Sequence, residues 1–199
     1  MNQDYIKARF KKNIPWNNEF KVPDTDVINN KNVILASILI PIIIRGNNIS
    51  ILLTRRTLKL QNHPGQISFP GGREEPNDNN SIETALRETN EEIGLKKKNI
   101  EVLGLLPKYL TTTSFLIRPV VAFVFSPFNL ILNKFEVEEI FEIPLNFFLS
   151  DGIFKKDITM TSEGKSNIFY IIEYEKYFIW GATAAILKNF FNYLKANNS

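Results

Sequence analysis

The sequence predicts an α/β protein in which a β-sheet carries helices on both of its faces. Two apolar runs rich in β-branched and aliphatic residues, 33–44 and 50–55, predict neighbouring strands. Residues 81–93 instead place apolar side chains at helical spacing, and 180–194 repeat this pattern in a longer, C-terminal helix. Because strands and helices alternate irregularly along the chain, the sheet is expected to be mixed.

The first two strands and the helix after them have clear boundary signals. Arg45-Gly46-Asn47-Asn48 separates the two strands and predicts a hairpin turn. The helix is expected to begin near Ser81, because Asn80 and Glu83 have the spacing of a capping box. It is expected to end at Gly94, since glycine readily adopts the left-handed conformation that terminates helices.

The second half of the chain predicts further strands and one more short helix. Ile100–Leu110 and Leu116–Phe125 resemble strands, and Val137–Leu149 is interpreted as a short helix interrupted by its proline. Ile168–Tyr174 is another strand candidate, after a loop at 161–166. No internal repeat or long low-complexity linker divides these elements. We therefore expect one domain over 1–199, with a core at about 30–190 and an N-terminal extension at 1–29.

Composition and charge exclude several classes of protein. The 199 residues are 44% hydrophobic and 23% charged, which is ordinary for a soluble domain. The net charge of +3 suits a small anionic ligand better than nucleic acid. Without cysteine, there is neither a disulfide nor a thiolate nucleophile. Residues 1–16 lack the apolar core of a signal peptide, and the apolar run 33–44 is shorter than the ~18 residues of a spanning helix. We expect a cytoplasmic protein without membrane association.

Three carboxylates gather on the helix at 81–93. Glu88, Glu91 and Glu92 stand at positions i, i+3 and i+4, so their side chains are neighbours on one helical face. A like-charge pair at this spacing costs about 0.2–0.5 kcal/mol on an open helix. A solvated charged face is one interpretation. A hard divalent cation is the other, because Mg²⁺ or Mn²⁺ turns the repulsion into oxygen coordination.

The residues around these carboxylates resemble the Nudix box, which marks hydrolases of nucleoside diphosphates linked to another group. The resemblance rests on Gly72 and on the run Arg87-Glu88-x-x-Glu91-Glu92-x-Gly94-Leu95. Arg87 follows Gly72 by fifteen steps, one more than in the usual box. The box glutamate expected between them is missing, with Asp78 or Asn79 in its place.

The segment before the box resembles one Nudix subgroup, the coenzyme A diphosphatases. Residues 52–72 read LLTRRTLKLQNHPGQISFPGG and follow that subgroup's motif without gaps. Two further segments resemble the subgroup more weakly, IFEIPL at 140–145 and IWGATA at 179–184. The resemblance covers about residues 30–190. It implies the Nudix α/β/α sandwich and a small-molecule nucleotide substrate of the coenzyme A type. Oligomeric state stays open, with a homodimer as one arrangement.

The resemblance assigns the acidic helix to a metal site for Mg²⁺ or Mn²⁺. Glu88 and Glu92, one turn apart, are the first candidates for metal ligands. Glu91 is a further ligand or the group that deprotonates or orients water. A backbone carbonyl of Gly71 or Gly72 is expected to contact the metal. Arg87 lies four residues from both Glu83 and Glu91, so we expect it to bridge the two and fix the base.

Substrate contact is expected from the segment before the box. His63 is the only histidine, and the resemblance places it with Gln66 in substrate contact or loop positioning. Arg55, Arg56 and Lys59 form a basic cluster suited to the ribose 3′-phosphate of coenzyme A, because guanidinium groups bind phosphate in bidentate fashion. A surface strand edge is the alternative for all three.

Further candidates have weaker support. The aromatic candidates to stack on adenine or to line a pantetheine channel are Phe69, Phe115, Tyr177 and Trp180, although most aromatic residues belong to the core. An additional catalytic carboxylate is sought among Glu138, Glu139 and Glu142.

Two rival functions remain. One is a Nudix hydrolase of another nucleotide, such as ADP-ribose, a dinucleotide polyphosphate or a damaged dNTP. The other is a non-catalytic nucleotide-binding regulator.

Overall fold

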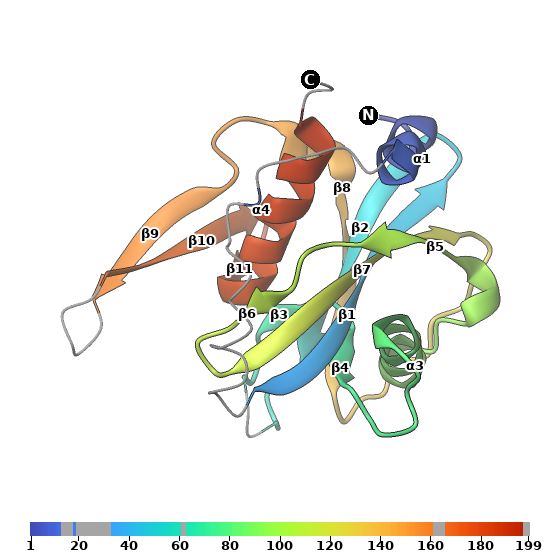
Figure 1. The fold of residues 1–199 in the computed structure, drawn as a ribbon, viewed down its shortest axis with the longest axis horizontal. Coiled ribbons are helices and arrows are strands. Elements are labelled where there is room, and N and C mark those ends of the chain that lie inside the picture. Colours follow the sequence, from blue (N-terminus) through green and yellow to red (C-terminus); the bar gives the residue numbers. More distant parts are fainter. Residues whose placement is uncertain (13–17, 19–32, 61–62, 161–165, 197–199) are drawn as a thin grey trace.

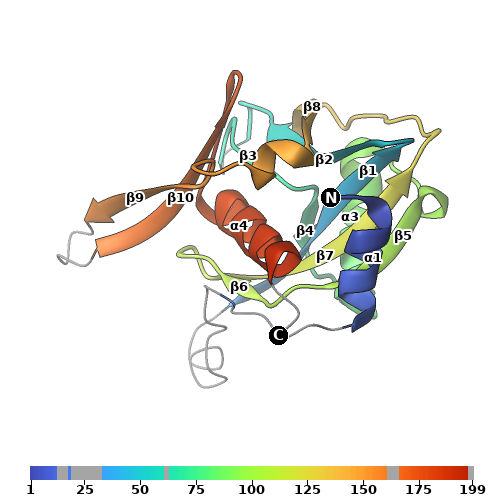
Figure 2. The same cartoon turned by 90° about the horizontal axis from the view of Figure 1, so that it is seen from above.

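The computed structural model describes residues 1–12, 18, 33–60, 63–160 and 166–196. It has three layers, with a central mixed sheet between helix α3 (Ser81–Ile93) and helix α4 (Gly181–Lys195) (Figure 1). The view from above separates the two helices on opposite faces of the sheet (Figure 2). The α/β/α arrangement and the mixed sheet expected from the sequence are therefore confirmed.

The sheet is built around two long parallel strands, β1 and β7, which pair along their whole length from Ile34↔Phe115 to Ile44↔Phe125. All other pairs in it are antiparallel, including the β1–β2 hairpin that closes at Arg45↔Asn48. Within the described residues the sheet has eight strands. They are β1 (Ile34–Arg45), β2 (Asn48–Arg56), β3 (Ile67–Ser68), β4 (Gly71–Arg73), β5 (Ile100–Leu105), β6 (Tyr109–Leu110), β7 (Phe115–Phe125) and β8 (Val137–Pro144).

Each face of the sheet has its own apolar core because successive strand residues point to opposite faces. On β1, Leu39 and Ile43 pack with Ala85 and Ile93 of α3. Ile40 and its alternating neighbours lie in the other core, with the buried face of α4. Apolar residues run continuously through β1 since both of its faces are covered.

Helix α3 begins and ends where the sequence predicts. The Asn80 side chain accepts hydrogen bonds from the backbone N–H of Ile82 and Glu83, at 3.0 and 3.1 Å. Glu83 in turn accepts from the backbone and the side chain of Asn79. Gly94 ends the helix with φ 72°, and its N–H donates to the Asn90 carbonyl. Both ends of the acidic helix are thus fixed by local interactions.

The chain ends and a second sheet complete the fold. Helix α1 (Gln3–Lys12) buries Ile6 and lies against α4, where Tyr5 donates to the Leu194 carbonyl at 2.8 Å. Arg9 donates to the Tyr193 carbonyl, and the Tyr193 hydroxyl donates back to the Arg9 carbonyl. The second sheet has the order β11-β10-β9, and its β9–β10 hairpin extends away from the body (Figure 1). Its strands are β9 (Lys155–Met160), β10 (Ser166–Tyr174) and β11 (Tyr177–Trp180).

Two sequence predictions need correction. Val137–Leu149 is not a helix, because β8 occupies 137–144 and a short 3-10 helix, η2, occupies Leu145–Leu149. Ile100–Leu110 forms two strands, β5 and β6, with Pro107 in the break. Within the segment 1–29, which the sequence predicts as an N-terminal extension, the structure places helix α1. The loop expected at 161–166 lies outside the described residues, except that Ser166 begins β10. Among the described helices, none has the length and apolar character to cross a membrane.

Candidate active site at the acidic helix

Two of the three predicted carboxylates face the diglycine turn. Glu92 is only 4% exposed, and its Oε2 accepts a hydrogen bond from the Gly71 N–H at 3.1 Å. The pKa of Glu92 is raised to about 8, chiefly by burial; the Gly71 N–H and the charge of Arg56 oppose the shift, and the charges of Glu136 and Glu88 add to it. Burial likewise raises the pKa of Glu88. Both carboxyl groups therefore favour a nearby positive charge.

The two glycines allow this approach for different reasons. A Cβ added to Gly72 would lie 2.4 Å from the Glu88 Cδ, so the carboxyl group rests directly on the glycine. Gly71 has φ 149°, and a Cβ there would lie 2.4 Å from the Ser37 carbonyl oxygen. Gly71 thus lets β4 pair closely with β1, and Gly72 lets Glu88 reach the turn.

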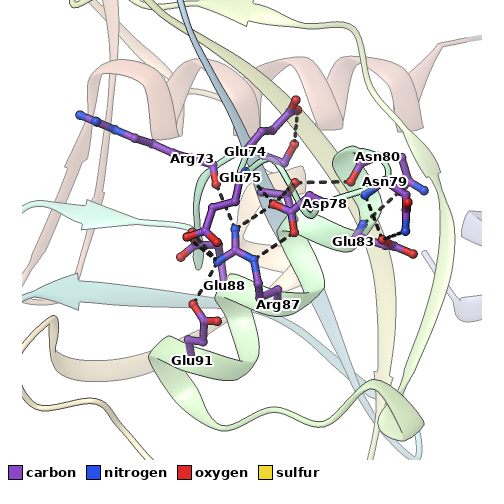
Figure 3. Close-up of polar contacts among 12 residues, drawn as sticks. Arg73, Glu74, Glu75, Asp78, Asn79, Asn80, Glu83, Arg87, Glu88 and Glu91 are labelled. Carbon is purple, nitrogen blue, oxygen red and sulfur yellow. Dashed lines mark hydrogen bonds and ion pairs between the residues drawn. The ribbon is translucent and has the colours of Figure 1, made fainter.

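Arg87 forms hydrogen bonds with the carboxylates on the exposed side of the acidic helix (Figure 3). Its Nε and Nη2 donate to both oxygens of Asp78, at 3.0 and 2.9 Å, and its Nη1 donates to Glu88 and Glu91 at 3.0 and 3.1 Å. The expected contact with Glu91 is present. The expected contact with Glu83 is wrong, because Glu83 turns back to the N-terminal end of its helix.

Asp78 is one of the two residues that the sequence offers in place of the missing box glutamate, and it pairs with Arg87. The Arg87 guanidinium holds the pKa of this carboxyl well below its usual range. The Thr84 hydroxyl and the Glu75 backbone N–H also donate to Asp78, both at 2.9 Å. The sequence left both Asp78 and Asn79 as substitutes for the box glutamate. In the structure Asp78 pairs with Arg87, whereas the Asn79 side chain donates to Glu83. Arg87 is therefore clamped between one buried carboxylate and two carboxylates of the site.

The donor set fits a hard divalent cation. It consists of carboxylate oxygens and glycine backbone, which are oxygen ligands of the kind that Mg²⁺ and Mn²⁺ prefer. The Glu92 Oε1 has Arg56 as its nearest cation, at 3.9 Å, and receives no hydrogen bond among the described residues. Nevertheless, no three acidic or histidine side chains in the described ranges converge as a closed metal cage, since Glu88 and Glu91 are turned toward Arg87.

The predicted basic cluster is divided between the two faces of the sheet. Arg56 lies on the α3 side and faces Glu92. Arg55, its neighbour on β2, pairs with Glu139 at 3.1 Å, and Glu139 also accepts from Lys176 and Tyr177. Lys59 is exposed, and its backbone N–H donates to the Thr57 hydroxyl. Only Arg56 joins the acidic group.

His63 and Gln66 lie in the connection between β2 and β3. His63 is exposed and adopts φ 55°, and its carbonyl accepts from the Gln66 N–H at 3.3 Å. The Gln66 carbonyl accepts from the Arg56 N–H at 3.0 Å, so the loop closes onto the strand end that carries Arg56. The Gln66 side chain lies near the start of α4, 4.0 Å from an ideal Cβ built on Gly181.

The weaker candidates are mostly placed elsewhere. Glu142 is held by Arg45 and Ser50, Glu139 belongs to the Arg55 group, and Glu138 is exposed. Phe69 and Tyr177 are buried, and Tyr177 stacks on Phe141 with ring centroids 3.6 Å apart. Phe115 lies under Arg73, and Trp180 is 45% exposed. Of these two aromatic rings, that of Trp180 is exposed and that of Phe115 is half-buried.

One acidic residue near the site was not predicted. The charge of Glu136 contributes to the raised pKa of both Glu88 and Glu92, although Glu136 lies forty-four residues after Glu92. No spacing signal links it to the helix, because a loop brings it there.

A hollow of about 390 Å³ lies on another side of α3, lined by Glu83, Leu86, Arg87, Asn90, Lys96 and Lys97. It includes neither Glu88 nor Glu92.

Comparison with known proteins agrees with this geometry. The NUDIX domain family model matches residues 36–145. The Nudix hydrolase NudL of Pectobacterium atrosepticum is 38% identical over 153 residues, covering 76% of this chain and 78% of the relative. NudL of Citrobacter koseri is 35% identical, covering 77% and 79%. The crystal structure of a MutT/nudix family protein from Enterococcus faecalis covers 96% of this chain and 74% of its own, with TM-score 0.52 and 15% identity, which supports the fold alone.

The family match covers more than half of the chain and includes the diglycine turn, α3 and Arg56. The curated relatives extend it over three quarters of the sequence. The chain therefore belongs to the Nudix family and is a Nudix hydrolase, a pyrophosphohydrolase acting on a nucleotide diphosphate.

Proposed function

We propose that this hydrolase cleaves the diphosphate bridge of coenzyme A or a derivative with the help of Mg²⁺ or Mn²⁺. The products are 3′,5′-ADP and 4′-phosphopantetheine or its acylated form. One observation carries the proposal: the loop with His63 and Gln66 begins and closes at Arg56, whose guanidinium faces Glu92. The segment that resembles the coenzyme A subgroup thus adjoins the acidic helix.

The acidic group is suited to hold the divalent ion on which Nudix hydrolases typically depend. Glu88 and Glu92 are the proposed carboxylate ligands, with a Gly71 or Gly72 carbonyl beside them. When bound, the ion neutralises the diphosphate, positions it and makes an attacking water more acidic. The buried Glu92 is fixed by the Gly71 N–H, so its geometry is set before a substrate arrives.

The remaining side chains orient the reaction. Glu91 is the proposed group that orients or deprotonates water, and Arg87 holds it in place. The Asp78 clamp fixes Arg87 in turn, because two parallel N–H···O bonds leave the guanidinium little freedom. Arg56 is the proposed contact for the diphosphate, since it adjoins Glu92 and is 27% exposed.

The 3′-phosphate of the ribose is the feature that separates coenzyme A from plain ADP compounds. Arg55 remains the proposed contact for it, with 39% of its side chain exposed beside Glu139. Lys176 binds the same carboxylate and adds a second cation to this group. His63 and Gln66 are proposed to position the loop or contact the substrate.

Product analysis tests the proposal. The purified chain is incubated with coenzyme A, with and without Mg²⁺ or Mn²⁺, and Glu92→Gln serves as the inactive control. We expect metal-dependent release of 3′,5′-ADP, and a much lower rate with dephospho-coenzyme A, which lacks the 3′-phosphate. Cleavage of ADP-ribose, dinucleotide polyphosphates or damaged dNTPs without cleavage of coenzyme A would keep the Nudix chemistry and discard this substrate.

The non-catalytic alternative has little support from the site. A regulator that only binds nucleotide has no need for three carboxylates on one helical face. The missing box glutamate was the argument in its favour. Asp78 supplies a carboxylate at that place and pairs with Arg87 through two hydrogen bonds. A chain inactive on every nucleotide of the panel would support the regulator instead.

A further inference from the structure

The most exposed apolar side chains of the described residues gather on two short segments beside the acidic helix. Phe135, Leu58 and Ile131 are 85, 76 and 73% exposed, more than any other large apolar side chain in the described part of the chain. Apolar residues scattered singly over a surface need no explanation, whereas a group of them indicates a contact surface. Leu58 and Phe135, here named the apolar pair, stand on the turns that adjoin β2 and β8.

The two members of the apolar pair stand opposite one another. The antiparallel pairing of β2 with β8 continues beyond the strand ends, since the Thr57 N–H donates to the Glu136 carbonyl at 2.9 Å. The next residues in this register are Leu58 on one side and Phe135 on the other. Side chains at opposed positions of two neighbouring segments are close enough to contact one ligand together.

Both turns are attached to the acidic site. Arg56 directly precedes Thr57, and its guanidinium faces Glu92. The segment that carries Phe135 is bound to the acidic helix itself, because the Asn133 N–H donates to the Glu92 carbonyl at 2.8 Å. The apolar pair therefore adjoins the proposed contact for the diphosphate.

Leu58 also contacts the loop with His63 and Gln66. A Cβ built on Gly65 would lie 2.9 Å from the Leu58 Cδ2, so the leucine side chain rests on this glycine. The contact fixes one side of Leu58 and leaves most of its surface in solvent. The apolar pair is thus continuous with the loop that is proposed to position or contact the substrate.

The two halves of the proposed substrate differ in the contacts that they need. The adenosine half is polar and carries the 3′-phosphate, for which the proposed contact is Arg55 on the other face of the sheet. The pantetheine arm begins next to the diphosphate with a geminal dimethyl group and continues through alkyl segments. Leucine and phenylalanine side chains have no hydrogen-bonding group, so they favour this alkyl surface, and contact removes both partners from water.

We propose that Leu58 and Phe135 bind the pantetheine arm where it leaves the diphosphate, and that they select coenzyme A over nucleotides without such an arm. The inference rests on the proposed function. The apolar pair acts on specificity and not on the reacting atoms, because neither side chain can hold a metal or move a proton. A nucleotide with only polar groups beyond its diphosphate gains no apolar contact from the pair.

The two products, each one half of the substrate, serve as separate probes. The inhibition constants of 4′-phosphopantetheine and of 3′,5′-ADP are measured against coenzyme A cleavage with Mg²⁺ or Mn²⁺. We expect Phe135→Ser and Leu58→Ser each to raise the constant of 4′-phosphopantetheine about tenfold relative to that of 3′,5′-ADP. Phe135→Ser is the primary variant, because Leu58 also packs on Gly65. Phe135→Leu should stay near the wild-type ratio, since it retains an apolar side chain.

The matched control is Ile158→Ser. Ile158 is 60% exposed, but it lies on the β9–β10 hairpin that extends away from the body (Figure 1). This variant should keep the wild-type ratio of the two inhibition constants. The kinetic constants for coenzyme A add a second readout. Contact with the arm is made equally before and during the reaction, so Phe135→Ser should raise KM more than it lowers kcat.

The outcomes separate this inference from the function on which it rests. A wild-type ratio in both serine variants, or a larger effect on 3′,5′-ADP, would overturn the role of the apolar pair and leave the coenzyme A function in place. Equal weakening of both inhibitors, together with a lower melting temperature, would assign the pair a structural role and also overturn the inference. Failure of the wild type to cleave coenzyme A would overturn the proposed function and this inference with it.

Discussion

Replacing each of the two adjacent glycines of the turn by alanine should have a different effect: Gly71→Ala should lower stability, and Gly72→Ala should lower activity. In Gly71→Ala the new Cβ meets backbone, 2.4 Å from the Ser37 oxygen and 2.6 Å from the Ile38 Cα. Backbone cannot move without breaking the β1–β4 pairing. In Gly72→Ala the Cβ meets only the end of the Glu88 side chain, at 2.4–2.6 Å. That side chain can rotate away, at the expense of the site.

The expected magnitudes follow from these contacts. Gly71→Ala combines overpacking of about 1–3 kcal/mol with backbone strain of about 1–3 kcal/mol. Their sum lowers the melting temperature by about 4 °C or more in a domain of this size. Gly72→Ala should melt close to the wild type. Its Glu88 carboxylate must move by about 1 Å, however, and a displacement of that size costs on the order of 10²-fold in kcat/KM.

The assay pairs thermal unfolding by circular dichroism with kcat/KM for coenzyme A cleavage in Mg²⁺. Gly152→Ala is the control, since its φ of +79° is strained for alanine but nothing lies within 4 Å of the new Cβ. It should lose about 1–2 kcal/mol and keep its activity. Full activity in Gly72→Ala, or equal melting of Gly71→Ala and Gly72→Ala, would refute the reasoning.

Three further outcomes are expected. Asp78→Asn should lose about 2 kcal/mol of folding free energy at pH 7, because charge-assisted hydrogen bonds to Arg87 are lost. Arg87 lowers the pKa of Asp78, so this stabilisation is fully present well above the ordinary value of 3.8 and is lost progressively as the pH falls from there toward the much lower pKa of the folded state. The difference in melting temperature between the two proteins should therefore begin to narrow below about pH 5 and continue to narrow with further acidification, and a constant difference would contradict the assignment. Arg56→Ala should lower kcat/KM about tenfold or more if it contacts the diphosphate, whereas an unchanged value would exclude that contact. Mn²⁺ at about 100 times its Kd should add about 2.7 kcal/mol, or about 5–11 °C, reversibly with EDTA, and no shift would argue against a metal site.

The sequence predicted best where the signal is local. Helix α3 begins after Asn80 and ends at Gly94, because both boundaries depend on hydrogen bonds within a few residues. The β1–β2 hairpin follows from its turn residues for the same reason. Residues 137–149 were wrongly predicted to form a helix, because Pro144 and a run of apolar residues suit a broken helix as well as a strand. Pairing with β2 decides between them, and this pairing joins segments about ninety residues apart.

The site residues likewise divide into those that local spacing predicts and those that depend on tertiary contacts. Glu88, Glu91, Glu92 and Arg87 share one helix, so their grouping followed from helical periodicity. Arg55 and Arg56 were expected together, yet neighbours on a strand point to opposite faces, and the structure separates them. Glu136 could not be found from spacing, because loop contacts with both α3 and β2 determine its position.

The contact between α1 and α4 has a consequence for the order of synthesis. Tyr5 and Arg9 bind carbonyl groups of α4 that lie 189 and 184 residues later in the chain. At about 5–20 residues per second, a ribosome needs roughly 10–40 s to make that interval. The ten residues of α1 are too few for a stable isolated helix. Helix α1 can therefore complete its contacts only after α4 has emerged from the ribosome, and full protection of α1 from a protease should report that α4 has been synthesised.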